Sequence, residues 1–138
     1  MEIKQCSVEQ LPLIMALSRQ LSEDEKSDNV FTDEELEQRL RSALEKDTEA
    51  YLFYHKEELA GYALVRTKAK PMYLWHFYIC RDMRRRHMGT EAFRLLMKEL
   101  NTDTIDLDVY CWNDRGKSFW KSLGFKERAI VMRWKAEA

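Results

Sequence analysis

The segment Met72–Cys80 (MYLWHFYIC) constrains the fold of this chain more than any other. Eight of its nine residues are apolar or aromatic, and only His76 interrupts the run. A half-exposed edge strand would alternate apolar and polar residues, so this run predicts a strand that is buried on both faces. Such a strand lies inside a sheet that is covered by helices on both sides.

The rest of the chain alternates between segments with the apolar spacing of helices and segments with the alternation of strands. Thr32 and Glu35 form the pattern of a capping box at the start of one helix. Apolar residues at helical spacing predict helices over residues 9–21, 32–46, 90–100 and 114–123. Strands are predicted over residues 2–6, 50–55, 59–67, 72–80, 104–111 and 125–134. The predicted order is β-α-α-β-β-β-α-β-α-β, a mixed α/β sheet with helices on both faces.

Composition and length favour one domain over residues 1–138, since 45% of the residues are apolar and 12% aromatic. No apolar run approaches the ~18 residues that span a membrane, and the N-terminus lacks the features of a secretory signal. We therefore expect a cytoplasmic protein without a membrane contact. Three separated cysteines with no CxxC pair argue against a disulfide framework and against a metal site.

Charge is distributed unevenly although the net charge is −1. Residues 1–60 contain 15 acidic and 7 basic residues, while residues 61–138 contain 9 acidic and 16 basic ones. This asymmetry suggests one face for an anion and another for a cationic group.

The basic run Arg81–Thr90 (RDMRRRHMGT) joins the buried strand to an amphipathic helix. Unpaired N–H groups at a helix start attract anions, and arginines add donors that fit phosphate oxygens. A phosphate cradle, a solvated turn and a nucleic-acid patch are the three interpretations. A pI of about 6.3 argues against nucleic acid. Neither the P-loop nor the dinucleotide fingerprint is present.

Two motifs now suggest a family. The run FYICRDMRRRHMGTEAFRLL resembles motif A of the GNAT acyl-CoA N-acyltransferases, and NDRGKSFWKSLGF (residues 113–125) resembles their motif B. The spacing of the motifs and the order of the elements are similar as well, so the resemblance covers essentially the whole chain. It implies the GNAT fold and transfer of an acetyl group from acetyl-CoA to a primary amine of a small molecule or peptide, by direct attack.

The resemblance also implies where acetyl-CoA binds. The backbone of the strand end would pair with pantetheine, the loop would hold the pyrophosphate, and the motif B helix would contact the rest of the cofactor. In that order, the implied residues are Phe77, Tyr78 and Ile79; Arg84, Arg85, Arg86, His87, Met88, Gly89 and Thr90; and Asn113, Lys117 and Trp120.

Two residues depart from the family pattern. His87 stands where the first loop glycine is usual, so it would hinder one backbone amide. Trp120 stands where many relatives have the tyrosine that protonates the departing thiolate. An indole N–H donates a hydrogen bond but does not release its proton. A non-catalytic acyl-CoA-binding regulatory domain is therefore the alternative function.

Asp108 and His76 are the candidate general bases, because direct attack requires a neutral amine. Their alternatives are a surface aspartate and a packed core histidine. The acidic residues between the first two helices could attract a cationic acceptor or simply form a solvated face. Apolar residues near Trp134 could serve a homodimer or belong to a buried last strand.

Overall fold

The computed structural model describes residues 1–84 and 86–137. Its sheet has five strands in the order β1-β2-β3-β4-β5. The first four pair antiparallel, and β5 is parallel to β4. The strands are β1 (Glu2–Cys6), β2 (Thr48–His55), β3 (Glu58–Arg66), β4 (Met72–Ile79) and β5 (Ile105–Asp106). The helices are α1 (Leu11–Glu25), α2 (Asp33–Lys46), α3 (Met88–Leu100) and α4 (Asp114–Ser122).

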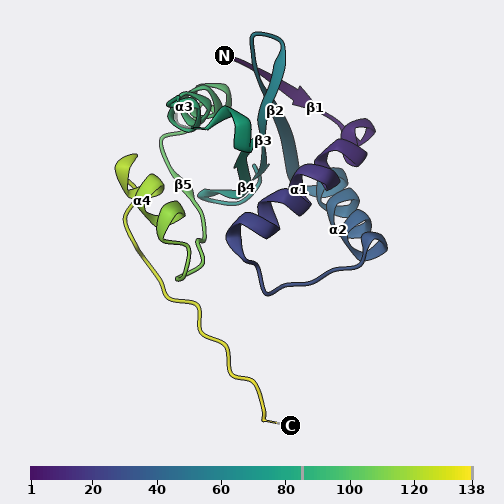
Figure 1. Ribbon diagram of the computed structural model, residues 1–138, viewed down its shortest axis with the longest axis vertical. Helices are drawn as coiled ribbons and strands as arrows, with labels where there is room; N and C mark the ends of the chain where they lie inside the picture. Colours follow the sequence, from purple (N-terminus) through teal and green to yellow (C-terminus); the bar gives the residue numbers. More distant parts are fainter. Residues whose placement is uncertain (85, 138) are drawn as a thin grey trace.

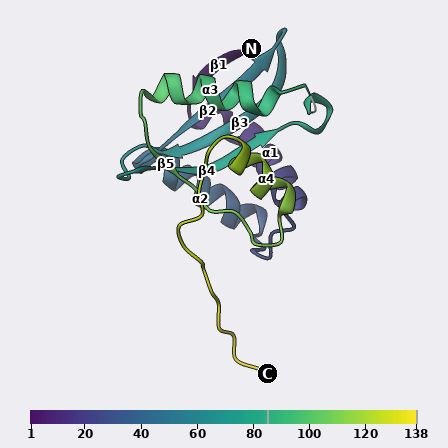
Figure 2. The same ribbon diagram turned by 90° about the vertical axis from the view of Figure 1, so that its left-hand side faces the viewer.

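Helices cover both faces of the sheet, as the strand Met72–Ile79 requires. Figures 1 and 2 show α1 and α2 on one face and α3 and α4 on the other. The sheet separates two hydrophobic cores, and alternate residues of β3 pack into each of them. Tyr62 and Leu64 pack toward α1 and α2, while Ala63 and Val65 pack toward α3. All four side chains are fully buried. The predicted mixed α/β architecture is confirmed.

Local chemistry determines the helix ends. Thr32 Oγ1 accepts the N–H of Glu35 at 3.1 Å, and Glu35 Oε1 accepts the N–H of Thr32 at 3.0 Å, which confirms the capping box. Helix α1 continues to Glu25, four residues beyond its predicted end. Lys26 then adopts the left-handed conformation (φ 52°) and donates its N–H back to the last turn, which ends the helix.

A β-bulge in β4 places two successive ring side chains on the same face of the sheet. Leu64 of β3 lies opposite His76, whereas the next residue, Val65, lies opposite Leu74, so Trp75 is the extra residue. The Trp75 and His76 ring centroids are 4.5 Å apart. Both rings lie on the α1–α2 side, since Trp75 packs in that core and His76 bonds to Tyr62 there.

Two predicted strands require correction. The strand predicted over residues 104–111 is limited to Ile105–Asp106, because β5 separates from β4 after these two residues. The strand predicted over residues 125–134, and with it the final β of the predicted order, is absent from the part of the chain that the structure describes. That segment extends away from the domain (Figures 1 and 2). Alternating side chains predict strand propensity but not the presence of a neighbouring strand.

Within the described residues, the helices are all too short or too polar to cross a membrane.

Gly61 provides a test of the β3–β4 pairing. It lies opposite Ile79, and a Cβ atom at this position would collide with the carbonyl oxygen of Tyr78. We expect Gly61→Ala to lower the free energy of unfolding by about 3 kcal/mol, since backbone atoms cannot yield as a flexible side chain can. Urea titration of the variant checks this. Glu58→Ala, at the exposed start of the same strand, is the control, and equal midpoints for the two variants would contradict the prediction.

Candidate active site

A gap between β4 and β5 forms the centre of the candidate site. The two strands pair only at Met72–Ile105 and Tyr73–Asp106. Past Tyr73, the edge of β4 that faces β5 has no strand partner among the described residues. An unpaired strand edge offers backbone N–H and C=O groups to an extended ligand that carries amides. The predicted residues Phe77, Tyr78 and Ile79 lie on this part of β4.

The N-terminus of α3 lies close to the end of β4. Ile79 is followed by a short 3-10 turn (Arg81–Met83) and then by the predicted loop. His87 precedes the helix, and no side chain caps the first turn. The N–H groups of that turn therefore remain available to an anion. Arg86 and His87 are exposed beside it, the predicted Met88, Gly89 and Thr90 form the turn, and Arg85 lies outside the described residues.

His87 holds the unusual backbone conformation of this loop. Its φ is 58°, in the left-handed region that glycine adopts most easily. Gly89 is small for a different reason, because a Cβ atom there would lie 3.0 Å from two ring atoms of Phe119 in α4. Gly89 thus lets the first turn of α3 pack closely against α4.

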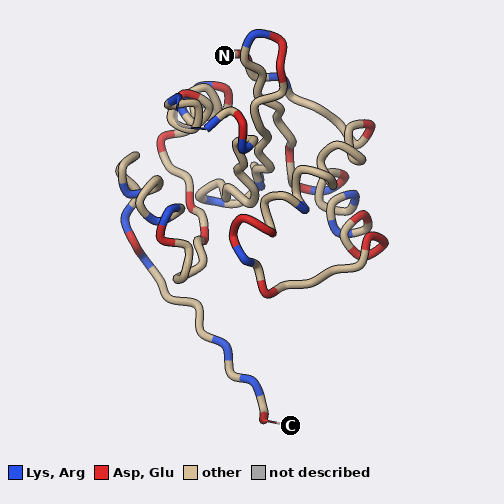
Figure 3. Tube along the Cα trace, in the orientation of Figure 1, with Lys and Arg blue, Asp and Glu red and all other residues tan. Residues whose placement is uncertain are grey.

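Arg84 does not extend into solvent as a phosphate-binding side chain would. Its guanidinium pairs with Asp24 at the end of α1, donates to the carbonyl oxygen of Ile79 at 2.8 Å and lies over the Tyr78 ring. Arg81 pairs with the same Asp24 at 2.8 Å and with Glu23 at 3.2 Å. Burial alone would raise the pKa of Asp24, but the hydrogen bonds from Arg84 and Arg81 hold it below its usual value. Figure 3 shows the acidic end of α1.

The predicted motif B residues have structural roles. The Asn113 side chain caps α4 by accepting the N–H of Gly116 at 3.0 Å. Lys117 donates to the carbonyl oxygen of Cys111 at 2.8 Å, which holds the loop before α4. Trp120 packs edge-on against Phe77 of β4, with ring centroids 5.3 Å apart, and so places α4 over the gap.

His76 is enclosed on the α1–α2 side of β4. Its Nδ1 lies 2.8 Å from the hydroxyl of Tyr62, a fully buried residue. Burial lowers the pKa of His76 from 6.5 to about 3, and the positive charges of Arg39 and Arg66 act in the same direction. The imidazole is therefore neutral at physiological pH and has little affinity for a proton.

Asp108 lies just past β5, exposed, at the mouth of the gap. Its neighbour is Tyr73 of β4. Burial and then the charge of Asp108 raise the pKa of Tyr73 to about 12, so the phenol stays protonated. An exposed carboxylate in this position can accept a proton from a substrate and release it to solvent.

Glu25 belongs to the predicted acidic cluster, but the sequence did not distinguish it from the other members. It ends α1, and burial followed by the charge of Asp24 raises its pKa. Its negative charge acts on buried Tyr62, the partner of His76. Its carbonyl oxygen accepts the indole N–H of Trp112 at 2.9 Å, which ties α1 to the loop after β5. In the sequence, Glu25 is one of several acidic residues in a polar stretch, and nothing there marks it as partly buried.

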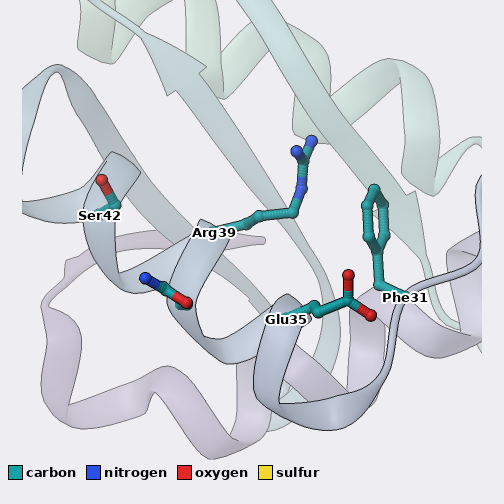
Figure 4. A pocket seen from close by; sticks show the side chains of 5 residues that line it. Phe31, Glu35, Arg39 and Ser42 are labelled. Carbon is teal, nitrogen blue, oxygen red and sulfur yellow. The ribbon is translucent and has the colours of Figure 1, made fainter.

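A surface cavity of about 440 Å³ opens beside the first turns of α2, lined by Phe31, Glu35, Gln38, Arg39 and Ser42. Figure 4 shows the side chains of Phe31, Glu35 and Arg39 close to one another. The Arg39 guanidinium lies 4.3 Å from the centroid of the Phe31 ring. Because Arg39 also acts on His76, the cavity lies within electrostatic reach of β4.

The sequence model of the acetyltransferase (GNAT) family matches residues 15–125. The chain belongs to the GNAT acetyltransferase family. A search of curated protein sequences finds no significant match. Among the described residues of this GNAT chain, no group of three or more His, Cys, Asp or Glu side chains is placed to hold a metal ion.

Solved structures share the fold at low sequence identity. A mutant of the BH1408 protein from Bacillus halodurans is 23% identical with a TM-score of 0.76, covering 99% of this chain and 100% of that one. A predicted acetyltransferase from Clostridium acetobutylicum, solved with acetyl-CoA, is 17% identical with a TM-score of 0.71 (97% and 95% covered). AAC(6')-Iy, in complex with the bisubstrate analogue CoA-S-monomethyl-acetylneamine, is 15% identical with a TM-score of 0.72 (99% and 98% covered).

The low pKa of His76 predicts how the stability of this GNAT chain depends on pH. The pKa of His76 is 6.5 in the unfolded chain and about 3 in the folded chain. At a pH between these two values, the unfolded chain binds a proton at His76 and the folded chain does not. Stability should therefore fall as the pH falls below about 6.5, by up to about 1.4 kcal/mol per pH unit for this group.

Urea titrations at about pH 6 and pH 5 measure this dependence. His76→Gln keeps a polar partner for Tyr62 but has no proton to bind, so its loss of stability should be smaller. Equal losses in the variant and the natural chain would contradict the enclosed, neutral state of His76.

Proposed function

We propose that this protein transfers an acetyl group from acetyl-CoA to a primary amine. One observation carries the proposal: the unpaired edge of β4 ends beside the uncapped N-terminus of α3. An acyl-CoA has the matching parts, since its pantetheine arm carries amides and its pyrophosphate is an anion. The solved relatives that hold acetyl-CoA or a CoA bisubstrate analogue support the same ligand. The proposal also places the protein in the cytoplasm.

The residues of this chain fit the ligand in a defined way. Phe77, Tyr78 and Ile79 would offer backbone groups to pantetheine, and the N–H groups of Met88, Gly89 and Thr90 would face the pyrophosphate. The exposed Arg86 and His87 add positive charge and donors, whereas the side chain of Arg84 is engaged by Asp24. Asn113, Lys117 and Trp120 would act by holding α4 over the gap.

The chemistry requires an amine without its proton. An ordinary ammonium has a pKa of ~10.4, so its deprotonation at pH 7 costs roughly 4.6 kcal/mol. Acetyl-CoA supplies the thioester, and the protein supplies a proton acceptor and the alignment. We assign the acceptor role to Asp108 rather than to His76, because a group with a pKa of about 3 takes up a proton poorly. A thiol of pKa ~8.5 needs little help to leave, so Trp120 in place of a tyrosine is compatible with turnover.

The amine acceptor would approach from the α1–α2 side, where Glu25, Tyr62 and His76 lie. Aminoglycoside 6'-N-acetyltransferases among the relatives support an amine acceptor. Much of the wider acidic cluster is engaged with cationic side chains of this chain. Ion pairs engage five members of this cluster, namely Glu23, Asp24, Asp28, Asp33 and Glu37. We therefore assign any attraction of the ammonium form mainly to Glu25.

Binding of acetyl-CoA is tested by thermal shift. Saturating acetyl-CoA should raise the melting temperature, and Gly89→Glu should abolish the increase, because it places bulk against Phe119 and a negative charge at the helix N-terminus. Arg94→Glu adds the same side chain on an exposed position of α3 and should keep the increase. If Gly89→Glu keeps the increase in melting temperature, acetyl-CoA does not bind at this helix N-terminus.

Release of CoA across a panel of amines then separates catalysis from the alternative function, acyl-CoA binding without turnover.

The role of Asp108 is tested with the best amine of that panel. Asp108→Asn should lower kcat by about 10²–10⁴ and leave the thermal shift with acetyl-CoA intact, because the carboxylate acts on the amine. Glu25→Gln is the comparison variant and should raise KM for the amine more than it lowers kcat. If Glu25→Gln instead lowers kcat strongly and Asp108→Asn mainly raises KM, Glu25 is the proton acceptor.

A further inference from the structure

The cavity beside α2 combines a polar wall with one aromatic side chain. Four of its lining residues, Glu35, Gln38, Arg39 and Ser42, follow one another at a spacing of three or four along α2 and therefore share one face of the helix. Phe31, in the loop before α2, completes the lining. A concave surface of about 440 Å³ with a few polar groups and one ring is suited to a small polar molecule.

Arg39 supplies the positive charge of this cavity. Its guanidinium lies 4.3 Å from the centroid of the Phe31 ring, and Figure 4 shows the two groups side by side. Contact with a ring restrains a guanidinium while its N–H groups stay free to donate. Among the described residues, no carboxylate forms an ion pair with Arg39. Arg41, on the same helix, pairs with Glu37 at 3.1 Å.

Glu35 lines the same cavity, but the helix cap holds its carboxylate. Glu35 Oε1 accepts the N–H of Thr32 at 3.0 Å, which directs the side chain toward the start of α2. The carboxylate does not pair with Arg39 and still lowers the net positive charge of the cavity. One guanidinium with a carboxylate nearby is suited to a singly charged anion better than to a doubly charged one.

A second arginine borders this region from the sheet. Arg66 ends β3, and its guanidinium lies 4.8 Å from the centroid of the Trp75 ring and 5.5 Å from that of Tyr73. Trp75 and Phe31 pack against the same hydrophobic core on the α1–α2 side. Burial lowers the pKa of His76 first, and the charges of Arg39 and Arg66 lower it further, so both arginines lie within electrostatic reach of this histidine.

Two carboxylates act on the same part of β4. The negative charge of Glu25 reaches Tyr62, whose hydroxyl lies 2.8 Å from His76 Nδ1. The charge of Asp108 reaches Tyr73. An acceptor that carries positive charge alone would be attracted by these carboxylates and repelled by the two arginines. A molecule with both an amine and an anionic group meets an opposite charge at each end.

We propose that the amine acceptor also carries a carboxylate, and that this carboxylate binds Arg39 in the cavity beside α2. The inference rests on the proposed acetyl transfer and narrows the acceptor from any primary amine to an amino carboxylate. The forked donors of a guanidinium match the two oxygens of a carboxylate. A carboxamide presents an NH₂ group to the same donors and is rejected, so Arg39 determines specificity without taking part in the chemistry.

Calorimetric titration of reaction products tests the proposal without requiring turnover. In the presence of CoA, the natural chain is titrated with N-acetylglycine, N-acetyl-β-alanine and N-acetyl-γ-aminobutyrate, and with the carboxamide of each. These three acids differ in the spacing between nitrogen and carboxylate. For the acid that fits best, the Kd should be about 10-fold lower than that of its carboxamide, as expected for a hydrogen-bonded charge pair.

Variants of α2 assign that preference to one side chain. Arg39→Gln should bring the two Kd values together, and Arg39→Lys, which keeps the charge but loses the fork, should retain part of the difference. Arg41→Gln is the matched control, since it makes the same change on the same helix, and should keep the full preference. Both arginines are exposed, and thermal melting shows that each variant is folded. Equal Kd values in the natural chain, or a preference that Arg39→Gln retains, would overturn the proposal.

Release of CoA separates this inference from the proposed function. Acetyl-CoA is mixed with glycine, β-alanine and γ-aminobutyrate, with their carboxamides, and with amines that lack a carboxylate. If the binding preference is present but no amine releases CoA, the carboxylate site stands and acetyl transfer fails. If amines release CoA but acids and carboxamides bind equally well, acetyl transfer stands and the assigned acceptor class is wrong.

Discussion

The unequal pairing of β4 is the constraint on which the rest of the structure depends. On one side, β4 pairs with β3 along almost its whole length, from Tyr73 to Ile79. On the other side, it shares two residues with β5. The first pairing holds the strand rigid in a core that is closed by helices on both faces. The second leaves backbone groups of β4 without a strand partner among the described residues, and such groups can bind an extended ligand.

The ion pairs between α1 and the basic run reduce the positive charge that the run can offer to an anion. The acidic first half and basic second half looked like two separate faces, yet Asp24 pairs with both Arg81 and Arg84. The arginine count of the run therefore overstates the charge that is available to an anion. Among the described residues of the run, the backbone groups of the first turn of α3 remain available together with Arg86 and His87, which makes local backbone geometry more important than net charge.

Features that depend on neighbouring residues could be predicted from the sequence. Thr32 and Glu35 form their capping box within one turn, and the position of Met72–Ile79 between helices on both faces of the sheet follows from its composition. Features that depend on distant residues could not be predicted. Glu25 is partly buried because Trp112 and the loop after β5 pack against the end of α1, a contact between residues 87 positions apart. The pKa of His76 falls because its ring is buried beside Tyr62, a residue 14 positions away in the chain.

The two corrected strands have one physical cause. Residues 104–111 and 125–134 both have the alternation of a strand, and both lack a complete ladder in a single copy of the chain. Strand propensity is expressed only when backbone groups find partners, so an edge without a neighbour stays short and a segment without a sheet stays extended.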